Sequence, residues 1–351
     1  MRIRTTLATM ILASCVMPAR AAPAPAPSVT RWSLAGTGGW DYLTLDPASG
    51  RLFVTRSDRV VVLATADGSV VGTIPDTDGV HGVALDRNKG KGFTSNGRGN
   101  SVTRFDLATL SVESVFPVSG QNPDAIVFDD ATREVWTFNG KSHDATALDP
   151  DSGRVVATVP LAGKPEFAVS DGRGEIFVND EDHATLLVID AKRHDVRSTW
   201  KLDDCDSPTG LAYDAAHHRL FSVCANQRMA VTDSQTGRHV ASVPIGRGPD
   251  AVAYDAESHR IYSSNGADGT LTVVREQGAD RFDPVATIPT QKSARTLALD
   301  ASGHRIYLAA ASFEPTPAAE TGQRARRPAI VPDSFCILVV PTTPPASDGQ
   351  R

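Results

Sequence analysis

Seven short apolar runs along this chain each end in an aspartate, turn, and restart as a second apolar run. The aspartates are 40, 43, 42, 43, 41 and 45 residues apart: Asp46, Asp86, Asp129, Asp171, Asp214, Asp255 and Asp300. A period in the low forties, filled with short strands, is typical of a β-propeller. A single blade cannot bury both of its faces, so blades stack in a ring around a channel. The count predicts an all-β, seven-bladed β-propeller with four-stranded antiparallel blades.

The sixth repeat shows the unit most clearly. Four runs rich in Val, Ile, Thr and Tyr, the composition of half-buried strands, occupy residues 251–254, 260–264, 270–274 and 284–289. We name them strands a to d, from the channel outward. Asp255 follows strand a, where its side chain can accept a hydrogen bond from its own backbone two residues on. Beyond the N-terminal 20 residues, no stretch keeps a helical apolar period over three turns.

The chain has seven a strands, but only six d strands follow them. Its last strand, residues 335–340, is a c strand, and residues 28–36 match the d-strand pattern. We therefore expect the N-terminal strand to complete the seventh blade and close the ring, which removes exposed sheet edges. Residues 28–341 then form a single propeller domain.

The N-terminus has the features of an export signal, which we assign to residues 1–21. Arg2 and Arg4 precede an apolar run that is too short to span a bilayer, and a small-residue cleavage site ends at Ala21. An alternative is lipid attachment at Cys15, which alone would anchor the chain to a membrane. The expected location is periplasmic or secreted.

The segments that flank the domain have low-complexity compositions. Residues 22–27 read as an Ala/Pro linker and residues 342–351 as a disordered tail. The net charge of −6 gives no indication of the positively charged surface with which proteins bind nucleic acids. We expect a monomer.

Three cysteines follow the leader. Cys205 precedes strand a of the fifth blade and Cys224 ends strand b of the same blade, so both lie on the same side of the disc. In an oxidising compartment this arrangement favours a disulfide, and the alternative is two buried thiols. Cys336 is expected in the core.

Strand b carries a recurring tetrapeptide: F-V-T-R (53–56), F-T-S-N (93–96), W-T-F-N (136–139), F-V-N-D (177–180), F-S-V-C (221–224), Y-S-S-N (262–265) and Y-L-A-A (307–310). These segments resemble the motif of the YVTN-repeat family, the YncE-like seven-bladed propellers of bacterial envelopes. The resemblance implies an envelope propeller. Some family members are described as binding DNA, and relatives serve as propeller subunits of amine dehydrogenases. The motif's asparagine is replaced at Arg56, Asp180, Cys224 and Ala310.

One residue in each blade stands five positions before the turn aspartate, where strand a enters at one end of the channel. These residues are Asp41, His81, Asp124, Glu166, Thr209, Asp250 and Arg295. We call this end, with the d–a and b–c loops, the top face. Four carboxylates in one ring predict a site for calcium, magnesium or a cationic or hydroxylated ligand, with Asp41, Asp124, Glu166 and Asp250 as possible metal ligands. The alternative is that the aspartates only cap the d–a turns.

The b–c loops are expected to form an outer ring on the top face, with candidate ligand-binding residues Asn96, Arg98, Asn139, His143, Asp180, His183 and Asn265. Residues 313–334 form an insertion in blade seven. We expect either a lid, with Arg324, Arg326 and Arg327 over the acidic mouth, or a disordered loop. Six histidines fall on the opposite, bottom face as solvated surface groups: His194, His217, His218, His239, His259 and His304.

No nucleophile elbow, haem-attachment, zinc-protease or phosphate-loop motif is present. The leading hypothesis is an exported, non-catalytic propeller that binds a small molecule, a cation or an envelope protein at the top mouth. The alternative is a metal-assisted hydrolase, lactonase or lyase that uses the same carboxylates, with His81 as acid or base. A third hypothesis, single-stranded DNA binding, comes from the resemblance and is opposed by the acidic mouth.

Overall fold

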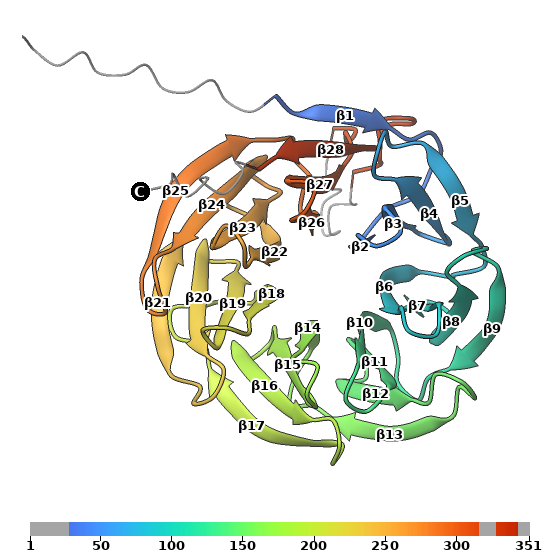
Figure 1. The fold of residues 1–351 in the computed structure, drawn as a ribbon, viewed down its shortest axis with the longest axis horizontal. Coiled ribbons are helices and arrows are strands. Elements are labelled where there is room, and N and C mark those ends of the chain that lie inside the picture. The colour runs from blue at the N-terminus through green and yellow to red at the C-terminus, as the bar shows by residue number, and fades with distance from the viewer. Residues whose placement is uncertain (1–27, 316–327, 343–351) are drawn as a thin grey trace, which may run out of the picture.

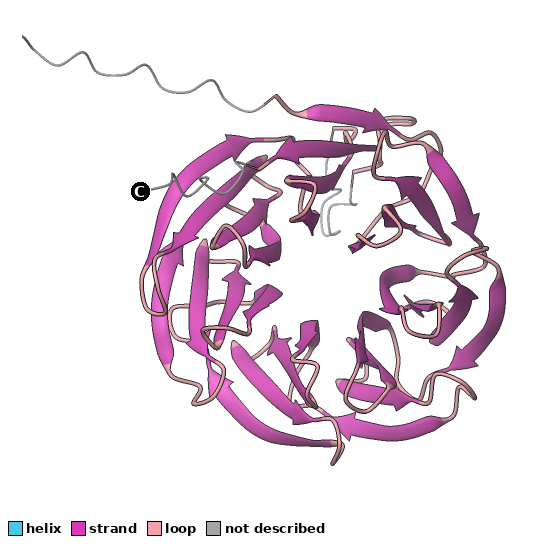
Figure 2. Ribbon diagram, in the orientation of Figure 1, coloured by secondary structure: helices cyan, strands magenta, loops and turns pink. Residues whose placement is uncertain are grey.

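The computed structural model describes residues 28–315 and 328–342, which form twenty-eight strands in seven four-stranded antiparallel sheets. The sheets stand as blades around a central opening (Figure 1). Strands and loops make up the whole described part of the chain, and no helix in it could cross a bilayer (Figure 2). The prediction of an all-β, seven-bladed propeller is confirmed.

Within each blade the strands follow one another from the channel to the rim. Blades one to three are β2 (Leu43–Asp46), β3 (Arg51–Arg56), β4 (Arg59–Ala64), β5 (Val70–Ile74); β6 (Val80–Asp86), β7 (Lys91–Asn96), β8 (Ser101–Asp106), β9 (Val112–Pro117); and β10 (Pro123–Asp129), β11 (Glu134–Asn139), β12 (Asp144–Leu148), β13 (Val155–Pro160). Blades four and five are β14 (Pro165–Ser170), β15 (Glu175–Asp180), β16 (Thr185–Asp190), β17 (Asp195–Lys201); and β18 (Pro208–Asp214), β19 (Arg219–Cys224), β20 (Arg228–Asp233), β21 (His239–Pro244). Blades six and seven are β22 (Pro249–Asp255), β23 (Arg260–Asn265), β24 (Thr270–Glu276), β25 (Phe282–Pro289); and β26 (Thr296–Asp300), β27 (Arg305–Ala310), β28 (Cys336–Pro341), β1 (Thr30–Ser33).

The apolar core lies between neighbouring blades. Phe53 of blade one and Phe105 of blade two, for example, are both fully buried and their rings pack 5.9 Å apart. Strands β3 and β7 are buried along nearly their whole length, whereas outer strands such as β9 alternate between half-buried and exposed residues. Stacking therefore buries both faces of each blade, as the repeat requires.

The repeated turn aspartates stabilise the a–b turns as the sequence predicted. Asp171, Asp214 and Asp255 each accept a backbone N–H bond from the residue two positions on, over 2.7, 2.9 and 3.0 Å. Some also bind the next blade, since Arg87 donates to Asp46 over 2.8 Å. A single residue thus sets the turn and fixes the stacking of two repeats.

The N-terminal strand closes the ring. β1 pairs with β28 at the rim of blade seven, Trp32 packs 5.5 Å from Tyr307, and the Leu34 amide donates to the Phe335 carbonyl over 3.0 Å. The prediction that residues 28–36 supply the missing fourth strand is confirmed.

Cys205 and Cys224 form a disulfide, and Cys336 is a buried thiol in β28. Both expectations are confirmed. The leader, Cys15, the Ala/Pro linker and residues 343–351 of the tail lie outside the described residues, as do Arg324, Arg326 and Arg327.

Candidate functional site

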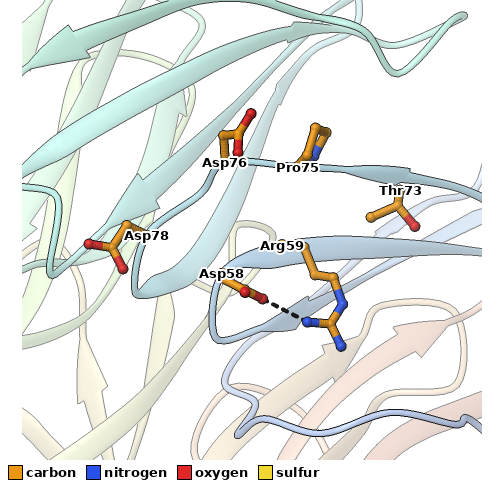
Figure 3. Close-up of a pocket in the computed structure, with 6 residues that line it drawn as sticks. All are labelled: Asp58, Arg59, Thr73, Pro75, Asp76 and Asp78. Atoms are coloured by element: carbon orange, nitrogen blue, oxygen red, sulfur yellow. Dashed lines mark hydrogen bonds and ion pairs between the residues drawn. The ribbon is translucent and has the colours of Figure 1, made fainter.

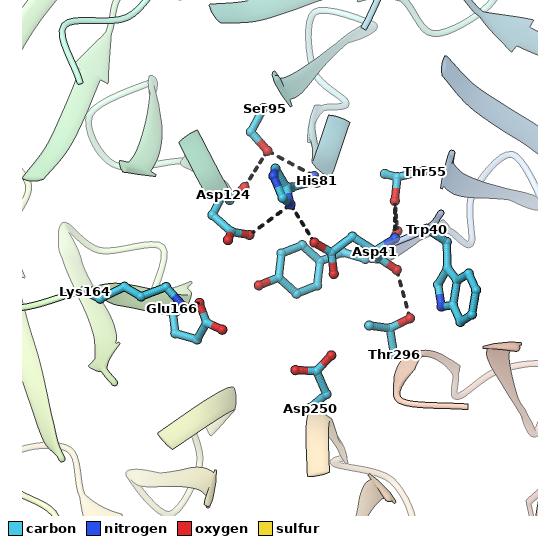
Figure 4. A network of polar contacts seen from close by, with 12 residues as sticks. Trp40, Asp41, Thr55, His81, Ser95, Asp124, Lys164, Glu166, Asp250 and Thr296 are labelled. Atoms are coloured by element: carbon cyan, nitrogen blue, oxygen red, sulfur yellow. Dashed lines mark hydrogen bonds and ion pairs between the residues drawn. The ribbon is translucent and has the colours of Figure 1, made fainter. Parts of the chain in front are cut away.

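Charged side chains from six of the seven blades converge at the top mouth of the channel, and Figure 4 labels most of them. The His81 Nδ1 lies 2.6 Å from Asp41 Oδ2 and 3.5 Å from Asp124 Oδ1. On the other side, Arg295 lies 2.5 Å from Asp250 and 3.6 Å from Asp41. The spacing selected seven residues. Six of them are charged groups of this one site, namely the five just described and Glu166.

Hydroxyl side chains of the same blade and of neighbouring blades fix the backbone of Asp41 and Asp124. The Thr296 hydroxyl donates to the Asp41 carbonyl over 2.8 Å, and the Asp41 amide donates to the Thr55 hydroxyl over 3.0 Å. Ser95 donates in the same way to the Asp124 carbonyl. The backbones of Asp41 and Asp124 are therefore each held by a hydroxyl of the blade beside them, and their side chains point into the mouth (Figure 4).

Crowding of carboxylates in a partly dry mouth raises their pKa values. Burial raises the pKa of Asp124 to about 6, and Asp41 adds to the effect although His81 opposes it. Burial likewise raises the pKa of Asp250 to about 6 against the opposing charge of Arg295. Burial and the neighbouring Asp124 raise the pKa of Glu166 to about 8. Burial and mutual repulsion thus keep protons on part of the ring near neutral pH.

Three cations face these carboxylates. Burial opposes the charge of His81, yet the hydrogen bond to Asp41 and the charges of Asp124 and Glu166 raise its pKa. The pKa of Arg295 is also raised, because Asp250 and Asp41 outweigh burial. Lys164 bonds Glu181 and lies 3.4 Å from Glu166, contacts that raise its pKa against the effect of burial.

Two carboxylate oxygens at the mouth have an ion-pair partner but no hydrogen bond. Asp124 Oδ1 and Glu166 Oε2 are both buried and accept no hydrogen bond from the described residues, and the nearest cationic nitrogens, His81 Nδ1 and Lys164 Nζ, lie 3.5 and 3.4 Å away. Such atoms are costly unless something else binds them. In addition, one ligand atom from each of Asp41, His81 and Asp124 lies within 4.8 Å of the other two, which is close enough to share a cation.

Thr209 differs from the other members of the ring. Its hydroxyl donates to the carbonyls of Val223 and Pro249, over 3.3 and 3.2 Å. This side chain links blades five and six and is already engaged with the backbone.

The expected outer ring divides into buried and exposed residues. Asn96, Asn139, Asp180 and Asn265 are fully buried, so the expectation that they project from the top face is wrong. Asn96, for example, donates to Ser101 and Thr103 of the adjacent strand and accepts from Thr94. These residues tie strand b to strand c. Arg98, His143 and His183 do have exposed side chains on the loops.

Two pockets open beside the ring. One, of about 390 Å³, is lined by Asp41, His81, Arg98 and Arg295 among others. The second, of about 380 Å³, shares Trp40 and Arg295 with the first and has an apolar wall of Phe313 and Ile330. These two wall residues pair as a β-bridge at the base of the blade-seven insertion. The described ends of the insertion therefore border the mouth.

A third pocket, of about 320 Å³, lies at the edge of blades one and two (Figure 3). Its carboxylates Asp58 and Asp78 are well exposed and pair with Arg59 and Arg98. Solvated, paired surface charges of this kind make a weaker candidate for a site than the buried carboxylates of the mouth.

Sequence reasoning missed three residues of the mouth. Tyr42 follows Asp41 and packs edge-on against Phe167 at 5.0 Å, and burial together with the carboxylates raises its pKa well above the usual value. Trp40 precedes Asp41, and Lys164 lies two residues before Glu166. These three residues could have been found because each lies within two positions of a ring residue. A rule that takes only one residue per blade overlooks them.

No protein-family model matches this chain, and no curated protein matches its sequence. Solved structures do resemble its fold. The WD40 repeats of RRP9 share 12% identity at a TM-score of 0.74, covering 90% of this chain and 99% of that one. A chain of the mitotic checkpoint complex shares 14% at 0.72, covering 96% and 100%. Kuenenia stuttgartiensis hydrazine synthase shares 13% at 0.67, covering 77% and 92%. Identities this low show the fold alone.

Proposed function

We propose that this protein is a non-catalytic binding propeller that takes a small cation, either a divalent metal ion or an organic ammonium ion, at its top mouth. One observation carries the proposal: Asp124 Oδ1 and Glu166 Oε2 are buried at the mouth and accept no hydrogen bond, and their nearest cations, His81 Nδ1 and Lys164 Nζ, stay 3.5 and 3.4 Å away. A bound cation would supply a closer partner. It would also offset the burial and the repulsion that together raise the pKa values of Asp124, Glu166 and Asp250.

The proposal predicts that binding is linked to protons. The raised pKa values mean that Glu166, and in part Asp124 and Asp250, carry protons near neutral pH. A cation must displace those protons, so its affinity should rise as the pH increases from about 6 to about 8. The adjoining apolar wall of Trp40, Phe313 and Ile330 offers space for the hydrocarbon part of an organic cation.

Isothermal titration calorimetry tests this directly. The probes are Mg²⁺, Ca²⁺ and benzylammonium, each at about pH 6 and about pH 8. We expect at least one probe to bind with greater affinity at the higher pH, and Asp124→Asn and Glu166→Gln each to weaken it at least about tenfold. Asp130→Asn is the matched control, because Asp130 is exposed beyond the opposite end of the strand that carries Asp124.

Absence of binding by all three probes would contradict the proposal. Equal weakening by Asp130→Asn and Asp124→Asn would also contradict it, since that result would indicate general surface charge and not the mouth.

A second candidate is a metal-assisted hydrolase, lactonase or lyase, favoured by the proximity of Asp41, His81 and Asp124. Asp41 and Asp124 would hold a divalent ion that polarises a carbonyl, and His81 would move the proton. Turnover in a lactone and ester library that needs added metal and is abolished by His81→Gln would support this candidate over simple binding. A protein that retains no stoichiometric metal after dialysis, and whose melting temperature is unchanged by calcium, magnesium or zinc, would exclude it.

We also infer that the chain is an envelope propeller of the YVTN-repeat type. The strand-b tetrapeptides support this inference, and three of them end in a buried asparagine, at positions 96, 139 and 265. Export to the periplasm and an envelope protein as an additional partner are part of the same proposal. Fractionation of the native host with an antibody against this chain tests the location, and a cytoplasmic signal alone would overturn it.

A further inference from the structure

The strongest unassigned cluster lies on the bottom face, at the opposite end of the blades from the mouth. His217 comes from the a–b turn of blade five, His259 from the a–b turn of blade six, and Glu276 from the end of β24. One ligand atom of each lies within 4.8 Å of the other two. These two bottom-face histidines are accessible to solvent, as expected, but they also face a shared buried carboxylate.

The distances within the cluster suit a small tetrahedral ion. His217 Nδ1 lies 3.3 Å from Glu276 Oε1, and His259 Nδ1 lies 3.6 Å from Glu276 Oε2. Ligands that sit about 2.0–2.1 Å from a tetrahedral Zn²⁺ are separated from one another by about 3.4 Å. The side chains already stand close to this spacing.

The carboxylate of Glu276 is the feature that points to a ligand. Its side chain is 0% exposed, and Oε1 accepts no hydrogen bond within the described part of the chain. Tyr254 donates to the other oxygen over 2.5 Å, which fixes the carboxylate. Each oxygen of the carboxylate thus faces one imidazole, and an ion among the three side chains would pair with the oxygen that accepts no hydrogen bond.

Neighbouring groups orient the histidines. Asp214 lies 2.7 Å from His217 Nδ1, the same nitrogen that faces Glu276, so an ion bound there would replace the proton between these groups. His259 is held by its turn, because its carbonyl accepts the Glu276 amide over 2.9 Å. The two side chains are 31% and 53% exposed, which leaves an open path for an ion.

Blade seven provides an internal comparison. Its a–b turn has the same Asp-x-x-x-His-Arg pattern, and the Thr342 amide donates to the His304 carbonyl over 2.8 Å, as Glu276 does to His259. Blade seven thus has the histidine and the backbone bond but a threonine in place of the glutamate. Of these two blades, only blade six has a carboxylate at this position.

We propose that His217, His259 and Glu276 form a binding site for a divalent transition metal of the zinc class. Two imidazoles and one carboxylate select such an ion over Mg²⁺ and Ca²⁺, which prefer oxygen ligands. Solvent completes the coordination. The ion joins blades five and six at their bottom edge and does not depend on the mouth.

The experiment uses the full chain, stripped with a chelator and then titrated with Zn²⁺ by calorimetry. We expect one ion bound at this site, with no competition from a millimolar excess of Mg²⁺. His259→Gln and Glu276→Gln should each raise the Kd at least about tenfold. Glu276→Gln keeps the shape of the side chain and the acceptor for Tyr254, so it serves as a second variant should His259→Gln fold poorly. His304→Gln, at the same turn position in blade seven, and Asp130→Asn, an exposed carboxylate in the a–b turn of blade three, should bind as the wild type does.

Co²⁺ provides a readout on the wild-type protein itself. A tetrahedral site with nitrogen ligands gives an intense visible absorption, which Zn²⁺ should abolish by displacement. Zn²⁺ affinity that is unchanged in both His259→Gln and Glu276→Gln would overturn the site. Equal losses in His304→Gln, or displacement of Zn²⁺ by Mg²⁺, would overturn it as well.

Discussion

At the scale of single residues, the mouth is built from charges that the chain only partly neutralises. The spacing of the repeat was enough to select Asp41, His81, Asp124, Glu166, Asp250 and Arg295, because each strand a enters the ring at the same point. It could not show which oxygens stay unpaired, since that depends on contacts between blades. Thr209 satisfied the same rule and yet bonds the backbone.

Glu166 should make stability depend on pH in a direction unusual for an acid. Its folded pKa is about 8 against an ordinary value of 4.5, so between these pH values the folded chain keeps a proton that the unfolded chain has lost. Stability should therefore fall as the pH rises through this window. Glu166→Gln cannot titrate and keeps Lys164 paired with Glu181, so at about pH 8 it should be more stable than the wild type by on the order of 2 kcal/mol.

Urea unfolding of both proteins from about pH 5 to about pH 8 measures the effect. The control is Glu257→Gln, because Glu257 is exposed in a turn on the bottom face and its substitution should leave the wild-type slope unchanged. The prediction fails if Glu166→Gln is less stable than the wild type at about pH 8.

At the scale of the strand, the tetrapeptide motif has a structural explanation. The buried Asn265 accepts a hydrogen bond from Ser263 and donates to Thr270 and Thr272, so it joins strands β23 and β24. The sequence showed that the tetrapeptide repeats, but it did not show where its last side chain points. A residue at the end of a strand can point into a loop or back into the sheet. This ambiguity led us to expect these asparagines on the top face.

Blade seven joins the same two strands with apolar residues at the equivalent positions. Leu308, Ala310, Cys336 and Leu338 occupy the positions that Ser263, Asn265, Thr270 and Thr272 hold in blade six. All four are buried in an apolar cluster. Polar and apolar versions are thus both stable, provided that every member of the set changes together.

This comparison predicts strong non-additivity in blade six. Asn265→Ala alone leaves buried hydroxyls without a partner and should cost about 2 kcal/mol in the free energy of unfolding. Asn265→Ala with Thr272→Val removes a donor and an acceptor together, so the double variant should cost less than the sum of the single changes. Chemical denaturation of the wild type, both single variants and the double variant completes the cycle. Simple additivity would refute the interpretation.

At the scale of the whole molecule, the repeat period determined nearly everything about the architecture. The number of blades, the strand order, the closing strand and the disulfide could be predicted, because each follows from a local pattern placed on a ring. The cluster of His217, His259 and Glu276 could not, because its members come from different positions in two repeats. The repeat period of the sequence does not specify which side chains of neighbouring blades come into contact.

Closure of the ring by β1 leads to the last prediction. A chain that begins at residue 37 lacks β1 and with it the pairing to β28 and the packing of Trp32 against Tyr307. The apolar strand β28 then becomes an open edge, which other chains can extend. We expect this truncation to lose at least about 3 kcal/mol of stability and to aggregate, whereas a chain that begins at residue 28 stays monomeric.

A synthetic peptide of residues 28–36 gives a sharper test than truncation alone. If the loss is specific to the missing strand, the peptide should add to the open edge of β28 and restore both solubility and melting temperature to the chain that begins at residue 37. A peptide with Trp32→Ala should rescue less, because it forms the backbone ladder without the indole that packs on Tyr307. Equal melting temperatures for the two truncations, or equal rescue by both peptides, would show that the N-terminal strand does not close the ring through these contacts.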